Sequence, residues 1–381
     1  MNVLLNFFPV RAGGGQQVAS NFIKIIAKKD FGHKWFLFVG SNSELYKLAK
    51  EYLPESQILS FEYNYQNRVF KQKDIKEFIQ SKKIDLIYSY GPILPIKNIP
   101  QVLRTVYSNL YFPEIDFWKG YPFFTKLKKK LIDYFRLKQT LKADGLIFEN
   151  KSMLERAASL FKYPETRVKY VEPSVTFFEE SKISEKYEHL KKIKEFKILY
   201  LSSWHLNKNI HILPEVANNL RERKYKVKFI LSLDAKHKTI QKLLFKKIIK
   251  FNVTDYFEFV GRVEATNVHQ VVKSSDAMIL LSKLECFSSN VMEAYYFEKP
   301  LIISDQPWAK AACIDAALFV DRDDSNDIAN NIINLISSKE LQKDLINKSK
   351  NRMKDFNTPE EKVYKQVQFL EYIHQHYEKS N

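Results

Sequence analysis

The sequence predicts an α/β protein built from two Rossmann-like, doubly wound domains. The chain has 381 residues, and at roughly 100 to 200 residues per domain this length indicates two domains or three. Short apolar runs alternate with segments whose apolar residues recur at helical spacing, as expected for parallel strands joined by helical crossovers. Hydrophobic residues make up 45% of the chain and aromatic residues 14%, which excludes a disordered or fibrous class.

The first half contains five strand-sized apolar runs. They are residues 2–7, 35–39, 84–88, 101–106 and 145–148, with helices expected near 16–28, 42–51 and 151–160. The apolar start of the chain has no basic residues before it and contains Asn6, so it is interpreted as a buried strand rather than a signal peptide. Residues 1–173 are therefore assigned to an N-terminal Rossmann-like domain.

The second half repeats the pattern more regularly. Strands are expected at 197–201, 227–231, 257–260, 277–281, 301–303 and 318–320, each separated from the next by a helix. Residues 197–360 are assigned to a C-terminal Rossmann-like domain, and the charged, patternless stretch 174–196 to the linker. Residues 361–381 keep an apolar stripe at helical spacing, which predicts a C-terminal helix that packs back on the body. No apolar run approaches the roughly 18 residues that span a bilayer.

The composition limits the partners and the chemistry. Lys and Arg number 61 against 44 Asp and Glu, and the net charge of +17 favours nucleic acid, phosphorylated molecules or an anionic membrane leaflet, or else reflects a solvated surface. Cys286 and Cys313 fit no zinc pattern and suit a reducing cytoplasm. The histidines lack metal-ligand spacing and Asp321-Arg-Asp323 is interpreted as a loop and helix cap, so neither a metal nor a cofactor is expected.

A glycine loop follows the first predicted strand. Gly13, Gly14 and Gly15 open a helix, where a backbone without side chains can approach a phosphate and the helix amino terminus offers N–H donors. The loop does not match the dinucleotide-binding pattern of glycines. It is also compatible with a flexible turn between a strand and a helix.

A second segment places two carboxylates close together in sequence. Glu285 leaves a predicted strand, and Ser288, Ser289 and Asn290 begin a helix whose first turn would contain Glu293. Carboxylates on either side of free N–H groups suit a ligand that has both hydroxyls and phosphates. Alternatively, Asn290 as N-cap and Glu293 at the third helical position would form a capping box without a ligand.

The stretch from Glu285 to Glu293, together with residues 298–305, resembles the signature of family-4 retaining glycosyltransferases of GT-B fold. Residues 201–210 look like the lysine-containing loop of that family, and residues 259–263 extend the similarity. The resemblance covers residues 197–336, and more loosely the glycine loop. It implies two Rossmann-like, doubly wound domains facing across a cleft, with residues 1–173 on the acceptor side and residues 197–360 binding the donor. It also implies metal-independent transfer from a nucleoside-diphosphate sugar, which is a co-substrate and not a cofactor.

The resemblance also implies roles for individual residues. Glu293 matches the carboxylate that binds the ribose hydroxyls of the donor. Glu285 matches the one that faces the transferred sugar, and Lys208 matches the base that neutralises the diphosphate, so these two are the predicted catalytic residues. The other donor-binding positions implied are Gly14, Gly15, Ser203, Arg262, Val263, Ser288, Ser289 and Asn290.

The chain departs from the family in two places. Ser203 stands where many relatives have an arginine, which leaves Lys208 with more of the diphosphate charge. In the first domain, Tyr107 or Ser108 occupies the place of the usual histidine. These two residues and Gly91, at the carboxyl end of another strand, are the predicted acceptor-side residues.

A basic segment with large apolar residues spans 117–142. Lys128, Lys129 and Lys130 are its centre, and Asp133 is its one acid, a composition that predicts contact with anionic lipid. Alternatively, Leu127, Leu131, Tyr134 and Phe135 would pack the helix on the protein and leave its bases in solvent.

The sequence therefore predicts a glycosyltransferase that is cytoplasmic and peripheral on the inner membrane face. The expected acceptor is a glycan or lipid-linked molecule in surface-polysaccharide synthesis, such as lipopolysaccharide, O-antigen or capsule. A basic nucleic-acid-binding protein and a catalytically silent sugar-nucleotide binder are the alternatives. No nucleic acid partner is expected, because the chain has no zinc-finger, RRM or homeodomain-like pattern.

Overall fold

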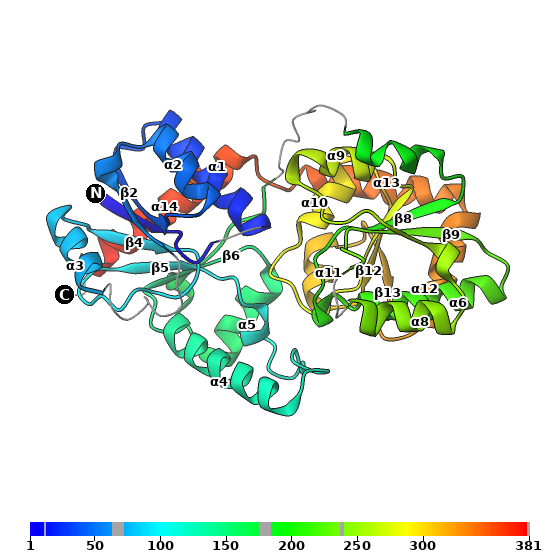
Figure 1. Cartoon of the computed structure of the whole chain (residues 1–381). Coiled ribbons are helices and arrows are strands. Elements are labelled where there is room, and N and C mark those ends of the chain that lie inside the picture. Colours follow the sequence, from blue (N-terminus) through cyan, green and yellow to red (C-terminus); the bar gives the residue numbers. More distant parts are fainter. Residues whose placement is uncertain (11–12, 63–71, 175–183, 237–239, 379–381) are drawn as a thin grey trace. The chain divides into compact units, whose positions relative to one another are not determined.

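The chain folds into two α/β units, each with its own parallel sheet (Figure 1). The computed structural model describes residues 1–10, 13–62, 72–174, 184–236 and 240–378. Unit 1 comprises Met1–Asp116, Tyr121–Ser174 and Asn357–Asn381, and unit 2 comprises Phe117–Gly120 and Val175–Phe356. The predicted class, α/β with two Rossmann-like domains, is confirmed.

Unit 1 is built on a seven-stranded parallel sheet of order β3-β2-β1-β4-β5-β6-β7. Its strands are β1 (Asn2–Asn6), β2 (Lys34–Gly40), β3 (Ile58–Phe61), β4 (Leu86–Ser89), β5 (Gln101–Arg104), β6 (Gly145–Phe148) and β7 (Val168–Tyr170). The order runs outward in opposite directions from β1 and β4, which makes the sheet doubly wound. The edge strands β3 and β7 are additions to the five predicted, and their residues are only partly buried.

Helices cover both faces of this sheet (Figure 1). They are α1 (Gly14–Lys28), α2 (Glu44–Tyr52), α3 (Gln72–Ser81), α4 (Phe123–Thr140), α5 (Lys151–Phe161) and α14 (Pro359–Glu378), with short 3-10 turns η1 (Glu55–Gln57), η3 (Ser108–Leu110) and η4 (Glu165–Arg167). The side chains of Ser43 and Asn150 cap α2 and α5 by accepting backbone N–H groups. Among the described residues, no helix is both long enough and apolar enough to cross a bilayer.

The last helix, α14, belongs to unit 1 although it follows unit 2 in the chain (Figure 1). Its apolar residues Val363, Val367, Leu370 and Ile373 lie in the same core as β1, β2 and α1. A Cβ atom at Gly145 would lie 2.9 Å from Ile373, so β6 needs glycine there for α14 to approach. Residues 379–381 of the predicted C-terminal segment lie outside the described part of the chain.

Unit 2 is built on a six-stranded parallel sheet of order β10-β9-β8-β11-β12-β13. Its strands are β8 (Phe196–Tyr200), β9 (Val227–Leu231), β10 (Phe257–Phe259), β11 (Ala277–Leu280), β12 (Leu301–Ser304) and β13 (Leu318–Val320). All six lie within the predicted runs or one residue beyond them. The strand order reverses between β8 and β11, at the centre of the sheet.

The helices of unit 2 are α6 (Leu213–Glu222), α8 (Lys246–Lys250), α9 (Val268–Lys273), α10 (Ser289–Tyr296), α11 (Pro307–Cys313), α12 (Ser325–Ser337) and α13 (Lys339–Met353). Shorter helical turns are η5 (Glu185–Lys192), η6 (Leu206–Lys208), η7 (Ile210–Ile212), η8 (Gln241–Phe245), η9 (Thr254–Tyr256) and η10 (Ala265–Asn267).

The stretch expected to be a linker, 174–196, is partly a component of unit 2. Residues 175–183 lie outside the described part of the chain. From Ser184 onward the chain packs on α9, because the backbone of Ser184 exchanges two hydrogen bonds of 2.9 Å with the side-chain amide of Gln270. Tyr187 and Leu190 of η5 are buried, so this charged stretch carries a small apolar face.

Candidate active site

The central strands of unit 2 bring two of the predicted loops together. β8 and β11 pair in parallel, and the strand order runs outward in opposite directions from them. Loops that leave such a pair diverge at the carboxyl ends of the strands and form a ligand-binding crevice. The loop after β8 carries Lys208, and the loop after β11 carries Glu285 and leads into α10.

Lys208 and Glu285 form an ion pair between these two loops. The Lys208 Nζ lies 2.6 Å from the Glu285 Oε1, although the residues are 77 positions apart. The two side chains are 19% and 17% exposed, so solvent screens the pair less than a surface pair. The structure thus brings together the two residues that the sequence predicts as catalytic.

Asn207 holds the two loops together. Its buried side-chain amide donates to the carbonyl of Leu284 over 2.8 Å and accepts from the backbone N–H of Leu284 over 3.0 Å. Its own carbonyl accepts the N–H of Lys283 over 2.9 Å. These three bonds fix the residue before Lys208 against the residues before Glu285.

Two further residues fix the backbone on either side of the ion pair. The Tyr200 hydroxyl donates to the carbonyl of Lys208 and accepts the N–H of Leu281 over 3.0 Å. Burial raises the pKa of Tyr200, so the hydroxyl keeps its proton. Asn209 adopts the left-handed conformation, φ 57°, and its side chain donates to the carbonyl of Arg322.

Arg322 is a positioning residue that the sequence reasoning misses. It lies in the loop before α12, as predicted for 321–323, but the N-cap of that helix is the next residue but one, Asp324. Its side chain, however, is buried and donates to the carbonyls of Leu281 over 2.9 Å and Asn207 over 3.4 Å. Acidic neighbours on both sides make it look like a surface residue in the sequence, and only the fold shows its contacts.

Glu293 lies deeper than Glu285. Ser288 is the N-cap of α10, so Glu293 is the fifth helical residue and lies beyond the first turn; the capping-box interpretation with Asn290 as N-cap is wrong. The side chain of Asn290 donates to Glu293 Oε2 over 3.3 Å and to the carbonyl of Leu201 over 2.9 Å. Burial raises the pKa of Glu293 to about 7, and the positive charge of Lys208 opposes the rise.

The other predicted donor-binding positions of unit 2 fall into two groups. Ser288, Ser289 and Asn290 form the start of α10, with Ser288 and Asn290 buried. Ser203 is exposed in the loop after β8, and the Arg262 side chain is 81% exposed and lies 3.5 Å from Glu264. Among the described residues, no hydrogen bond or ion pair joins Ser203, Arg262 or Val263 to Lys208, Glu285 or Glu293.

In unit 1 the glycine positions follow the two central strands, β1 and β4. Gly13 has φ 70° and precedes α1, which begins at Gly14, and Gly15 lies in its first turn. Gly91 follows β4 with φ 142°, and a Cβ atom there would lie 2.9 Å from Pro9 Cγ in the loop after β1. The strand order of unit 1 reverses between β1 and β4, so these glycines lie where doubly wound sheets bind ligands.

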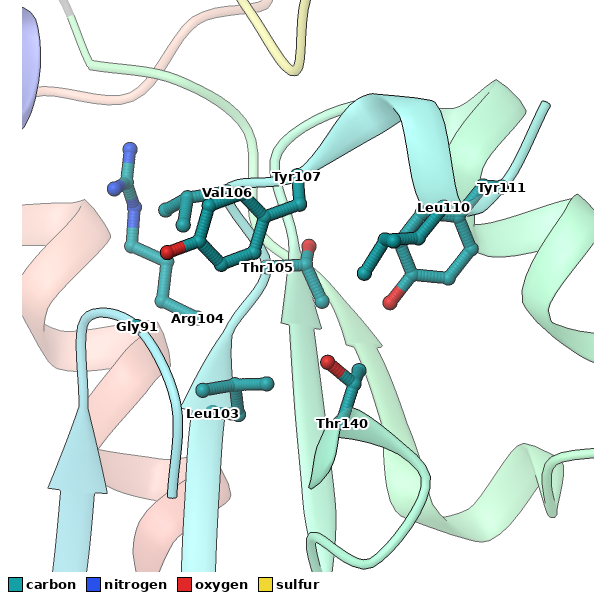
Figure 2. Close-up of a pocket in the computed structure, with 9 residues that line it drawn as sticks. All are labelled: Gly91, Leu103, Arg104, Thr105, Val106, Tyr107, Leu110, Tyr111 and Thr140. Atoms are coloured by element: carbon teal, nitrogen blue, oxygen red, sulfur yellow. The ribbon is translucent and has the colours of Figure 1, made fainter. Parts of the chain in front are cut away.

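A small pocket lies at the carboxyl end of β5. Figure 2 shows its lining, which comes from the loop after β4, from β5 and the turn that follows, and from the last residue of α4: Gly91, Leu103, Arg104, Thr105, Val106, Tyr107, Leu110, Tyr111 and Thr140. Two of the three predicted acceptor-side residues, Gly91 and Tyr107, line this pocket. Ser108 is buried in η3 instead.

The predicted basic helix is α4, and its orientation contradicts one of the two interpretations. Leu127, Leu131, Tyr134 and Phe135 are 51–57% exposed, so they do not pack the helix on the protein. Lys128 and Lys130 are exposed and Lys129 is half-buried.

Among the described residues, no cluster of three or more His, Cys, Asp or Glu side chains could hold a metal ion.

Comparisons with known proteins agree with this architecture. Residues 181–352, which include Lys208, Glu285 and Glu293, match the family described as Glycosyl transferases group 1. A search of the curated proteins finds no match.

Several solved structures share the fold across nearly the whole chain. Sucrose-phosphate synthase from Thermosynechococcus elongatus has a TM-score of 0.73 at 13% identity, covering 99% of this chain and 100% of that one. A glycosyltransferase from Rickettsia africae has a TM-score of 0.71 at 15% identity and 98% coverage of both chains. WaaG, a glycosyltransferase involved in lipopolysaccharide biosynthesis, has a TM-score of 0.70 at 11% identity, covering 95% and 98%. The resemblance to glycosyltransferases of GT-B fold is therefore confirmed.

Proposed function

We infer that this chain, with a group 1 glycosyltransferase domain on a GT-B fold, moves a sugar from a nucleoside-diphosphate donor to a glycan or lipid-linked acceptor with retention of configuration. The observation that carries this proposal is the cluster of Lys208, Glu285 and Glu293 at the point where the strand order of unit 2 reverses. It combines a cation for phosphates with two carboxylates for hydroxyls.

In the proposed donor complex, the Lys208 ammonium neutralises the diphosphate beside the amino terminus of α10. Both are preorganised positive charge, which stabilises the negative charge that develops as the diphosphate leaves. Glu293 accepts hydrogen bonds from the ribose hydroxyls, and Glu285 faces the transferred sugar. HepE from Anabaena, whose fold is similar with a TM-score of 0.68 at 15% identity over 97% of this chain and 99% of that one, has been solved with UDP, which supports a nucleotide donor here.

The reaction requires one bond to break and one to form. The bond from the anomeric carbon to the diphosphate oxygen breaks, and the electron pair leaves with the diphosphate. The acceptor hydroxyl attacks the same face, and its proton passes to the departing phosphate oxygen. Lys208 and the N–H groups of α10 supply the stabilising charge, so the proposal needs no metal ion.

The geometry disfavours a glycosidase that uses a carboxylate nucleophile. In such an enzyme the ionised carboxylate must be free to attack the anomeric carbon of the sugar. Here Lys208 engages Glu285, and Glu293 is buried beneath Asn290. Transfer from an activated donor needs neither group as nucleophile.

The acceptor is proposed to be a surface-polysaccharide intermediate at the cytoplasmic face of the inner membrane. The similarity of fold to WaaG supports a role in polysaccharide synthesis. We place the acceptor beside Gly91 and Tyr107, at the carboxyl end of the sheet of unit 1, and Lys128, Lys129 and Lys130 of α4 offer a contact with anionic lipid.

Thermal stabilisation by a panel of nucleoside diphosphates tests the donor site. A ligand at 100 times its Kd adds about 2.7 kcal/mol to the free energy of unfolding, so binding raises the Tm measurably. The Glu293→Ala variant should lose this shift, whereas the exposed Lys343→Ala variant should keep it. No shift with any diphosphate would contradict the proposal. Binding without sugar transfer to any glycan or lipid-linked acceptor would indicate a silent sugar-nucleotide binder.

A further inference from the structure

We propose that α4 inserts an outward-facing apolar stripe into the interface of an anionic bilayer. This deepens the membrane contact of the proposed function and rests on it. The contact proposed above is electrostatic, whereas the structure assigns a second, apolar component to the same helix.

The stripe consists of the side chains that α4 turns away from unit 1. Figure 1 shows α4 along the outside of the unit. Phe123 and Phe124 are 73% and 81% exposed, and Leu127, Leu131, Tyr134 and Phe135 are each more than half exposed. Their spacing of three and four residues aligns them on one side of a helix with 3.6 residues per turn. An exposed stripe of six large apolar residues marks an interaction surface.

The opposite face of α4 is the polar one. Asp133, 12% exposed, accepts from the Asn109 side chain over 2.7 Å and from Arg136 over 3.1 Å. The Arg136 guanidinium lies 4.3 Å from the centre of the Tyr107 ring, and Lys126 pairs with Asp116. These contacts fix the rotation of the helix, so its apolar side must face outward.

Bases lie at both edges of the stripe. At about 100° per residue, Lys128 falls beside Phe135 at one edge and Lys130 falls beside Phe123 at the other. Lys138, at the far end, lies 4.5 Å from the Tyr134 ring. Asp133 is the sole acid of α4 and faces inward, so this outer face has one sign of charge. An apolar stripe between lysines is the pattern of an interfacial helix, in which the long side chains reach the lipid headgroups.

The positive charge of the outer face of α4 favours an anionic bilayer over a second copy of the chain as its partner. A second copy of the chain would bring two positively charged faces together, which like-charge repulsion disfavours. An anionic bilayer accepts the bases and the apolar side chains at once. The opposite side of α4 also contacts a predicted acceptor-side residue, since the Arg136 guanidinium lies over the ring of Tyr107. Insertion would therefore place Tyr107 on the side of α4 opposite the lipid.

Co-sedimentation with vesicles of neutral lipid, alone or with a third of anionic lipid, separates the apolar component from the electrostatic one. The stripe variant is Leu127→Ser with Leu131→Ser, the charge variant is Lys128→Gln with Lys130→Gln, and the control is Lys343→Gln on α13. The substituted side chains are exposed, so each Tm should stay close to that of the unaltered protein. A Tyr134→Trp variant reports insertion through the blue shift of its emission.

We expect anionic vesicles to bind the unaltered protein and the control, and to shift the emission of the Tyr134→Trp variant to the blue. The stripe and charge variants should each bind at least tenfold more weakly. Equal binding of the stripe variant, or no blue shift, would overturn insertion in favour of surface attraction. Dimers that form without lipid and are lost in the stripe variant would assign the stripe to a second copy. All variants should keep the Tm shift with nucleoside diphosphates, because α4 is not part of the proposed donor site. If the unaltered protein itself shows no such shift, the proposed function is wrong, whatever the vesicles bind.

Discussion

The ammonium of Lys208 lies 2.6 Å from the carboxylate of Glu285 in the ligand-free site. In the proposed donor complex the same ammonium must face the diphosphate. Its ion pair with Glu285 is then weakened, and the Glu285 carboxylate accepts hydrogen bonds from the hydroxyls of the sugar instead. The pair therefore holds the lysine side chain in position before the donor binds. Because Asn207 fixes both loops, this exchange needs only side-chain movement.

Replacing Lys208 with Met should impair turnover more than donor binding. The charge on the departing phosphates is larger in the transition state than in the ground state, so loss of the ammonium should lower kcat by about 100-fold or more, as for other oxyanion-stabilising donors. Steady-state kinetics with a nucleotide sugar and a Kd for the diphosphate separate the two effects. Lys343→Met, an exposed change on α13, is the control, and equal losses in kcat and affinity would indicate simple donor anchoring.

Replacing Glu293 with Gln should stabilise the protein at alkaline pH. The folded pKa of about 7 lies above the ordinary value of 4.5, so the unfolded state loses its proton first as pH rises. The contribution to stability is complete below pH 4.5 and is lost as pH rises to 7. At 1.36 kcal/mol per pKa unit the loss is on the order of 3 kcal/mol.

Urea unfolding at pH 5 and pH 8 checks this linkage. Glu293→Gln should unfold with nearly the same free energy as the unaltered protein at pH 5, and with a higher one at pH 8. Its affinity for nucleoside diphosphates should fall, because an amide is a poorer acceptor for two ribose hydroxyls than a carboxylate. The same difference in stability at both pH values would rule out a raised pKa.

Most of the fold could be predicted from the sequence because the central strands of parallel sheets are buried on both faces. Runs such as 277–281 are therefore continuously apolar and easy to detect. The two strands missing from the prediction, β3 and β7, lie at the sheet edges and are only four and three residues long, with no fully buried residue in either. The missed linker helix η5 has only Tyr187 and Leu190 as buried apolar residues in a charged stretch.

The candidate site could be predicted only in part from the sequence. The resemblance pointed to Lys208, Glu285 and Glu293, but not to Asn207 and Arg322, whose contacts join segments 77 and more than 100 residues apart. For α4, the composition indicated an amphipathic helix but not its rotation. That rotation depends on the contacts of Asp133 with Asn109 and of Arg136 with Tyr107, which join α4 to residues near η3.

Replacing Asn207 with Ala should weaken both stability and turnover. The change leaves the N–H and carbonyl of Leu284 buried without their partner, and each unsatisfied group costs about 1 to 3 kcal/mol. The loops of Lys208 and Glu285 then lose their alignment, so kcat should fall with little change in the pH dependence of activity. Chemical denaturation and kinetics measure the two effects, and an unchanged kcat in a destabilised variant would restrict Asn207 to folding.

Treatment with EDTA should leave the transferase activity intact. The proposed stabilisation of the leaving diphosphate comes from Lys208 and the amino terminus of α10. Activity after exhaustive chelation, compared with activity after adding back Mg²⁺ or Mn²⁺, is the measurement. A strict requirement for either ion would contradict the proposed mechanism.

The last prediction concerns a buried charge cluster that joins α14 to the sheet of unit 1. Glu149 accepts bonds from Arg104 over 2.7 and 2.8 Å and from Lys362 over 2.7 Å, and its side chain is 5% exposed. Burial alone would raise the pKa of Glu149, but the charges of Arg104 and Lys362 outweigh it and hold that pKa well below its usual range. The stability that this depressed pKa contributes is present above the ordinary pKa of 4.5 and is lost as pH falls below it.

Glu149→Gln should therefore lower the free energy of unfolding by about 3 to 5 kcal/mol at pH 7, because two cations stay buried without their counter-ion. Adding Lys362→Met to that variant should recover part of the loss, since one uncompensated charge is removed. Glu165→Gln, an exposed change on η4, should stay within about 0.5 kcal/mol of the unaltered protein. Urea unfolding of the four proteins at pH 7 and pH 3 measures this coupling, and the deficit of Glu149→Gln should shrink at the lower pH. If Glu149→Gln alone is as stable as the unaltered protein at pH 7, the charge cluster does not hold α14 in place.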